Sequence, residues 1–296
     1  MGTVLVSSTA FAGELTVTGS AGVTLTGEDN SNKGNGWTMG DSLTFSGSAE
    51  QDNGWNVTMS QEIDGGSLDD FSIKVDMGDL GTVTFAGHCT TGVIGNRDAL
   101  TPTANEEAHG VAVAGTQTGG TSDAEDSNFF IFDYTALDGV AIKASYNPSH
   151  TTTRVESSTE IGVHYTGVDG LNVYYAMGEN NDDPYTAGRK ELRNAAVTYA
   201  AGSFTVGYQV NEVDSDKADK DQDFSAIGIS YQVNDDVSVS LNQSSVDYEQ
   251  SGLDDQDATG VSISYTQGGM TVSASHSTID NVAGAEASDN LSLIHI

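Results

Sequence analysis

Five repeated hairpin patterns constrain the fold of this chain more than any other feature of its sequence. In each pattern an alternating apolar–polar run ends at a tyrosine, a short polar or glycine-containing turn follows, and a second alternating run returns. The clearest copy is residues 128–146, NFFIFDYTALDGVAIKASY, with its turn at Asp138-Gly139. Period-two alternation on both sides of an Asp-Gly turn predicts an antiparallel β-hairpin.

The tyrosines that precede the turns recur every 31 to 34 residues. One hairpin with one tight turn and one long polar connection accounts for a repeat of that length. Aromatic side chains in register at strand ends are typical of the girdle that a membrane barrel places at the lipid–water interface. The predicted girdle consists of Tyr134, Tyr165, Tyr199, Tyr231 and Tyr265.

The rest of the chain extends the strand count. Residues 14–26 alternate over a length sufficient for one tilted transmembrane strand, and residues 43–59 and 73–85 form further hairpins, with polar loops at 27–40 and 64–70. One first strand and seven hairpins give fifteen strands, and a shortened sixteenth is expected from about Ser288. An open edge would leave backbone groups unpaired in lipid. We therefore predict an all-β fold, a transmembrane antiparallel up-and-down β-barrel of 16 strands.

Composition narrows the class of protein. The chain has 43 acidic and 10 basic residues, a formal net charge of −33, which disfavours nucleic-acid binding and suits a lumen that attracts cations. Its single cysteine, Cys89, cannot form an internal disulfide. No apolar run is long enough for a transmembrane helix. Residues 1–12 resemble the end of a secretory signal peptide, so we expect a single barrel domain over 13–296.

The longest stretch without alternation is residues 89–127, with many acidic residues and glycines. Loops of this length are uncommon in compact domains unless they carry function. We therefore predict that this loop serves as the functional element of the barrel. A secreted, adhesin-like β-sandwich would show similar alternation. The small, uncharged inward set of Ser, Thr, Gly, Asn and Gln favours the barrel.

Residues 78–88, GDLGTVTFAGH, the long loop, and residues 126–146 resemble the general diffusion porins of Gram-negative bacteria. The resemblance implies that the third loop folds into the lumen, that three barrels assemble as a homotrimer, and that acidic loop residues face a basic wall. The loop acids would be Asp98, Glu106 and Glu107. The family's Pro-Glu-Phe-Gly-Gly motif is replaced here by residues 105–110, NEEAHG, and its wall arginine by His88.

Lys74 and Lys143 are unusual because they lie mid-strand on the polar face. A lysine facing lipid costs about 2–4 kcal/mol at the bilayer midplane, so both are expected to face the lumen. There they would either neutralise acids such as Asp76 and Asp133 or line the constriction opposite the loop acids. With His88 they form the predicted basic wall of the pore.

No set of residues predicts an enzyme. The acids are scattered through loops, and the six histidines show no metal-ligand spacing. Residues 214–223 are rich in Asp and could bind Ca²⁺ loosely, although a solvated acidic loop explains them as well. No cofactor is expected. We predict a passive, cation-preferring diffusion channel for small hydrophilic solutes and ions in the outer membrane. The alternative is a substrate-specific channel.

Overall fold

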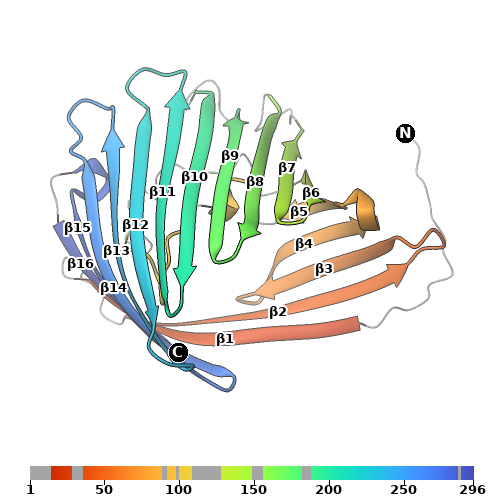
Figure 1. Ribbon diagram of the computed structural model, residues 1–296, viewed down its shortest axis with the longest axis horizontal. Helices are drawn as coiled ribbons and strands as arrows, with labels where there is room; N and C mark the ends of the chain where they lie inside the picture. The colour runs from red at the N-terminus through yellow and green to blue at the C-terminus, as the bar shows by residue number, and fades with distance from the viewer. Residues whose placement is uncertain are drawn as a thin grey trace.

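A computed structural model describes residues 15–28, 36–88, 92–97, 100–108, 128–148, 156–181, 188–285 and 288–296. Sixteen antiparallel strands form one closed barrel in which each strand pairs with its neighbours in sequence, and β16 pairs with β1 (Figure 1). The predicted 16-strand up-and-down barrel is confirmed, and the β-sandwich alternative is wrong. No helix among the described residues is long and apolar enough to cross a membrane.

The strands follow the alternating segments of the sequence, and the longest are β1 and β2, with 14 residues each. Their bounds are β1 Leu15–Glu28, β2 Trp37–Glu50, β3 Asn56–Asp64, β4 Ser67–Asp76, β5 Thr82–His88, β6 Phe129–Leu137, β7 Val140–Asn147, β8 Ser158–Val168, β9 Leu171–Asn180, β10 Lys190–Ala201, β11 Phe204–Ser215, β12 Gln222–Gln232, β13 Val237–Tyr248, β14 Gln256–Gln267, β15 Met270–Asp280 and β16 Ser288–His295. Three 3₁₀ turns, η1 Gly78–Leu80, η2 Gly95–Arg97 and η3 Val282–Gly284, complete the described elements.

One predicted loop is wrong. Residues 64–70 were expected to form a polar loop, but β3 continues to Asp64 and β4 begins at Ser67. Gly65 and Gly66 both have positive φ, 55° and 82°, a backbone conformation that makes a two-residue hairpin turn. Asp69 and Asp70 therefore belong to a strand.

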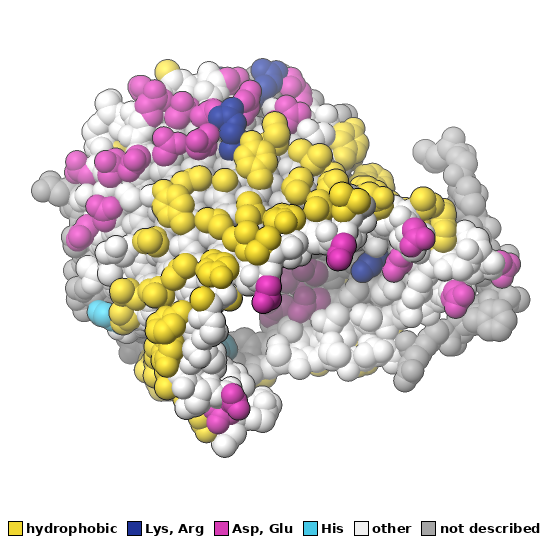
Figure 2. Space-filling view, in the orientation of Figure 1, with side chains coloured by type: hydrophobic (Ala, Val, Ile, Leu, Met, Phe, Trp, Pro, Cys, Tyr) yellow, Lys and Arg dark blue, Asp and Glu magenta, His cyan; other side chains and the backbone are white. Residues whose placement is uncertain are grey.

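Apolar side chains face outward, as the alternation predicts. Ile263 is 47% exposed and Tyr231 36% exposed, and neither is enclosed between two sheets. Figure 2 shows the outward side chains as a hydrophobic band, with acidic side chains gathered on the side of the long loops. These acids continue the outward face of the strands toward that rim, and they include Glu179, Glu191, Glu212, Asp223 and Asp247. The outer surface thus has an apolar belt and an anionic rim.

The inner face is less uniformly polar than expected. Leu192, Val213, Phe224 and Ile279 occupy inward positions and are at most 4% exposed. Leu192 and Val213 pack against Val93 and Ile94, and Ile279 packs against Ala108, all three in chain that crosses the interior. Phe224 packs against Ala226 and Val246 of the wall itself. Apolar side chains are stable there because that chain removes them from water. The prediction of a purely polar interior is therefore wrong for this half of the barrel.

Candidate functional site

Part of the loop between β5 and β6 lies against the inner wall of the barrel. We call residues 92–97 and 100–108 the lining segment. Its contacts fall on inward-facing residues of β8 to β15, described in the next paragraphs. Asp98 and residues 109–127 lie outside the described residues, so the course of the complete loop 89–127 stays a prediction.

The first turn of the lining segment is held by Glu160 of β8. The Glu160 carboxylate accepts hydrogen bonds from the backbone N–H groups of Val93, at 2.6 Å, and Ile94, at 3.2 Å, and from the Ser145 hydroxyl, at 3.1 Å. Glu160 is only 4% exposed. A buried carboxylate needs several donors to offset its lost hydration, and these three provide them.

Arg97 holds the next turn. Its Nη1 donates to the Tyr175 carbonyl at 2.8 Å, and its Cζ lies 5.7 Å from the centre of the Tyr174 ring. The Arg97 carbonyl accepts from the side-chain amides of Asn194, at 2.8 Å, and Gln209, at 2.7 Å. Burial lowers the Arg97 pKa, against opposing effects from Tyr174 and Glu160, but arginine still carries its charge at neutral pH.

Amide and hydroxyl side chains hold the middle of the segment. The Gln209 side-chain oxygen accepts from the Leu100 N–H at 2.8 Å, and the Asn242 amide donates to the Pro102 carbonyl at 2.9 Å. The Ala104 N–H donates to Ser240 Oγ at 2.9 Å. The segment is therefore fixed by wall side chains across several strands.

The far end of the segment reaches β14 and β15. The Asn105 amide donates to Ser275 Oγ at 2.8 Å and accepts from Ser273 Oγ at 2.8 Å. Ala108 packs against Ala258 and Ile279. The lining segment thus extends from β8 to β15 along one side of the lumen.

The predicted loop acids lie near this far end. The Glu106 carbonyl accepts from the Thr103 hydroxyl at 2.9 Å and from Ser262 Oγ of β14 at 3.4 Å. Burial raises the Glu106 pKa, and the nearby His295 opposes that shift. Glu107 is 7% exposed. Glu106 is less buried, and it is therefore the more accessible of the two from the lumen.

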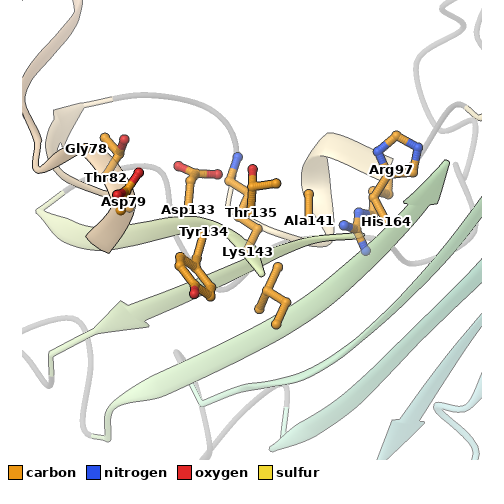
Figure 3. A pocket seen from close by; sticks show the side chains of 12 residues that line it. Gly78, Asp79, Thr82, Arg97, Asp133, Tyr134, Thr135, Ala141, Lys143 and His164 are labelled. Carbon is orange, nitrogen blue, oxygen red and sulfur yellow. The ribbon is translucent and has the colours of Figure 1, made fainter. Parts of the chain in front are cut away.

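A cavity of about 550 Å³ lies in the lumen beside the lining segment (Figure 3). Asp79 and Asp133 line it together with Arg97, Lys143 and His164. Figure 3 shows the side chains of Asp133, Thr135 and Lys143 on one side of the strands and Tyr134 on the other. Lys143 is the cross-strand neighbour of Asp133. Both predicted roles for Lys143, charge partner and pore lining, fit this place.

The other two predicted wall bases lie apart from this cavity. Lys74 occupies the inward position next to the outward Ile73 and faces Thr58 and Thr84 across the sheet. His88 ends β5, with Nδ1 3.2 Å from an Asp70 carboxylate oxygen and 3.8 Å from Asp69. The three predicted wall bases therefore do not form one cluster.

Strand pairing brings two aspartates and one histidine together in a cluster that their spacing in the sequence does not reveal. Among the described residues, the ligand atoms of Asp69, Asp70 and His88 lie within 4.8 Å of one another and could hold a metal ion.

In the predicted Ca²⁺ loop, Asp214 lies 2.9 Å from Arg193 and Asp216 lies 3.7 Å from Arg189. Those two carboxylates already have cationic partners, which favours the solvated-loop interpretation.

The predicted girdle tyrosines lie near the short turns. Tyr165, Tyr199, Tyr231 and Tyr265 are 36–48% exposed, and the centre of the Tyr231 ring lies 4.5 Å from that of Phe204 on the neighbouring strand β11. Their role at a lipid interface stays a prediction. Their outward position fits it.

Sequence reasoning missed most of the residues that hold the lining segment, namely Glu160, Asn194, Gln209 and Asn242. A signal existed. Inward positions of β8 to β15 carry long amide and carboxylate side chains, whereas those of β1 and β2 are mostly Ser, Thr and Gly. Longer polar side chains on one half of a barrel indicate that something in the lumen needs hydrogen-bond partners.

Comparison with known proteins gives a consistent result. The model of the Gram-negative porin family matches residues 2–284. Among solved structures, an anion-selective porin from Comamonas acidovorans has a TM-score of 0.71 and 13% identity, covering 95% of this chain and 98% of that one. A loop-deletion mutant of OmpT, an outer membrane protein of Vibrio cholerae, has a TM-score of 0.67 and 18% identity, covering 94% and 98%. A mutant porin of Rh. blastica has a TM-score of 0.67 and 15% identity, covering 95% and 98%. None of the curated proteins matches this chain.

Proposed function

Because this chain belongs to the Gram-negative porin family, it forms a diffusion channel in the outer membrane, and we propose that this channel is a passive, water-filled pore that prefers cations. The observation that carries the proposal is the division of the lumen. The lining segment covers the inner face of β8 to β15, while inward residues of β1 and β2 such as Thr18 and Gly40 remain exposed. Solutes would pass between the segment and that exposed wall.

Charge supports the preference for cations. Acidic residues outnumber basic ones by 43 to 10, and the outward acids near the long loops, from Glu179 on β9 to Asp247 on β13, lie beside the mouth of the barrel. A mouth of one charge sign raises the local concentration of the opposite ion. Monovalent and divalent cations would therefore enter more readily than anions of the same size.

The position of the loop acids supports a field across the pore. Glu106 lies over β14, and Lys143 projects inward from β7. These strands are seven apart in a barrel of sixteen, so they stand on nearly opposite walls. Carboxylate on one side and ammonium on the other would orient polar solutes as they pass. Lys74 on β4 adds a second inward cation, and Asp98, the third predicted loop acid, belongs to the same loop.

The mechanism is equilibrium permeation, not catalysis. Selectivity comes from the width of the opening and from the sign of the charges that line it. No bond is made or broken, and the mechanism needs no cofactor. Small hydrophilic solutes would cross down their concentration gradients.

Planar-bilayer recording in a salt gradient tests the proposal. The purified protein is expected to produce stepwise conductance, with a reversal potential of the sign given by cation flux. The similar porin from Comamonas acidovorans is named as anion-selective, so either sign is compatible with the fold. An anion-type reversal potential would refute the charge argument, and a silent bilayer would refute the open pore.

We also propose that three barrels assemble as a homotrimer. The outward face of β1 and β2 alternates large apolar side chains with small ones such as Gly19, Ala21 and Gly47. Small outward residues let two barrel walls approach closely, and the adjacent apolar side chains then fill the contact. Light scattering of the detergent-extracted protein, corrected for bound detergent, is expected to give three times the monomer mass. A monomer mass would refute the trimer.

A further inference from the structure

Three glycines form a continuous row beneath the lining segment. Gly207 of β11 pairs directly with Gly228 of β12, Gly228 pairs with Asn242 of β13, and Asn242 pairs with Gly260 of β14. All three glycines are buried and occupy inward positions. We call Gly207, Gly228 and Gly260 the glycine row.

The row is one place where the lining segment lies directly on the wall. A methyl group on Gly207 would lie 2.5 Å from Pro102 Cδ, one on Gly228 would lie 2.9 Å from the Pro102 carbonyl oxygen, and one on Gly260 would lie 2.8 Å from Ala108 Cα. The Pro102 carbonyl oxygen and Ala108 Cα are backbone atoms, and Pro102 Cδ belongs to a ring that is closed onto the backbone, so rotation of a side chain of the segment cannot relieve these contacts. The wall side chains of Asn242 and Ser277 also lie 2.5 Å and 2.8 Å from the methyl groups added at Gly228 and Gly260, respectively.

Hydrogen bonds beside the row keep the segment from moving sideways. Asn242 lies within the row and donates to the Pro102 carbonyl, while Ser240 and Ser262 lie next to it and contact Ala104 and Thr103. The glycines provide space and these side chains provide attachment. Together they fix both the height and the lateral position of residues 101–108.

We propose that the glycine row determines the aperture of the pore, because it sets how close to the wall the lining segment lies. This inference rests on the proposed channel function. Carbon atoms in contact normally lie about 3.5–4.0 Å apart, so an added methyl group at 2.5 Å moves the segment by about 1 Å. The strands are held in a closed sheet, and the displacement therefore goes into the lumen. A larger side chain in the row narrows the channel.

The test compares alanine variants of the row with an alanine variant of an outward-facing strand glycine. G207A, G228A and G260A are expected to lower single-channel conductance, because a lining displaced into the lumen reduces the width of the opening. They are also expected to slow the flux of larger sugars more than that of small ions. G27A is the matched control, because Gly27 lies on the outward face of β1 and a methyl group on it meets only Ser292 atoms, at 3.9 Å.

A rescue experiment separates aperture from general disturbance of the sheet. The nearest atoms to a methyl group on Gly207 are Cδ and Cγ of Pro102 and Cγ2 of Thr198. Pro102→Ala removes Cδ and Cγ. The double variant P102A/G207A is therefore expected to have the same single-channel conductance as P102A alone, close to that of the wild-type protein. A merely weakened strand would not be restored by a change in the loop.

The outcomes are distinct. Reduced conductance in the row variants, normal conductance in G27A, and recovery in the double variant support the inference. Unchanged or increased conductance in row variants that retain heat-modifiable gel migration overturns it, as does failure of the rescue. If G207A does not fold, folding of P102A/G207A supports the contact and failure of both overturns its assignment. A wild-type protein without conductance overturns the proposed function instead.

Discussion

Two halves of this barrel follow the same outer pattern and differ completely on the inside. The inner face of β8 to β15, which we call the lined wall, carries Glu160, Asn194, Gln209 and buried Leu192. The inner face of β1 to β5, the open wall, carries mostly small residues on β1 and β2, such as the exposed Thr18, and the charged Glu62 and Lys74 on β3 and β4. Both halves turn Leu, Ile and Val outward. The outward side chains of the two halves have the same surroundings, whereas their inward side chains do not.

The difference shows that inward side chains are selected by what covers them. On the lined wall the loop removes water, so apolar side chains gain from burial and polar ones must find partners. On the open wall water supplies those partners, and small hydroxyls leave room for it. The lined wall therefore serves as the barrel's core, and the open wall serves as the surface of its channel.

The largest expected effect comes from the apolar part of the lined wall. Leu192→Ala removes a side chain that is 1% exposed and packs against Val93 and Ile94. Truncation of a buried leucine costs about 2–5 kcal/mol in the free energy of unfolding. The measurement is urea unfolding in lipid bilayers, followed by the fluorescence of Trp37 and Trp55. If the comparison is right, Thr18→Ala on the open wall changes that free energy by less than about 0.5 kcal/mol. Equal effects of the two variants would contradict the division into two walls.

A smaller effect is expected at the polar anchor of the lined wall. Glu160→Ala leaves the N–H groups of Val93 and Ile94 without their acceptor. Each unsatisfied buried donor costs about 1–3 kcal/mol, reduced wherever water enters the gap. We expect a lower unfolding free energy and added low-frequency noise in single-channel current, because the first turn of the segment is loosened. Glu62→Ala, an inward glutamate of β3, is the control. If the single-channel current of E160A has no more low-frequency noise than that of the wild-type protein, this anchor does not position the segment.

Selectivity should respond to pH through Glu106. Burial raises the pKa of this group, so Glu106 takes up a proton at a higher pH than an exposed glutamate does. As pH falls, the negative charge of Glu106 is therefore lost at a higher pH than an exposed glutamate would lose it, and the cation preference weakens in a step as this group takes up its proton. The reversal potential measured from neutral to acidic pH reports this step. E106Q is expected to lack it and to start from a weaker preference. An identical pH profile in E106Q would place the selective charge elsewhere.

Much of the fold could be predicted from the sequence, because the relevant signals are local patterns within each strand and turn. Alternation, turn residues and the tyrosine spacing predict the strands, their number and their outward face, because the period of two is a property of each strand alone. They also identify 89–127 as the loop that differs from the others. The same alternation places Lys74 and Lys143 on the polar face, and their role as the basic wall of the pore stays a prediction.

The contents of the lumen could not be predicted in this way. Which inward residues meet the lining segment depends on the register of strands that are distant in sequence. Gly207, Gly228 and Gly260 look like ordinary strand glycines until pairing places them in one row. Asp69, Asp70 and His88 come together only because β4 pairs with β5. Strand register and the position of the loop depend on contacts between residues that are distant in sequence, so local patterns in a single sequence do not predict them.

The smallest expected effect lies at the rim above the lined wall. Arg189 donates to Glu156 from Nε at 2.9 Å and also through Nη2, and both side chains are exposed. The hydrogen bond from Arg189 lowers the Glu156 pKa, so the pair stabilises the fold above the unfolded-state pKa of Glu156, and that contribution is lost as pH falls through its folded-state pKa. Exposed pairs are strongly screened by water and salt. R189Q should therefore leave conductance unchanged and shift the unfolding midpoint only slightly, and less at high salt than at low salt. A loss as large as that of L192A would mean that the rim, not the buried lining, holds this half of the barrel together.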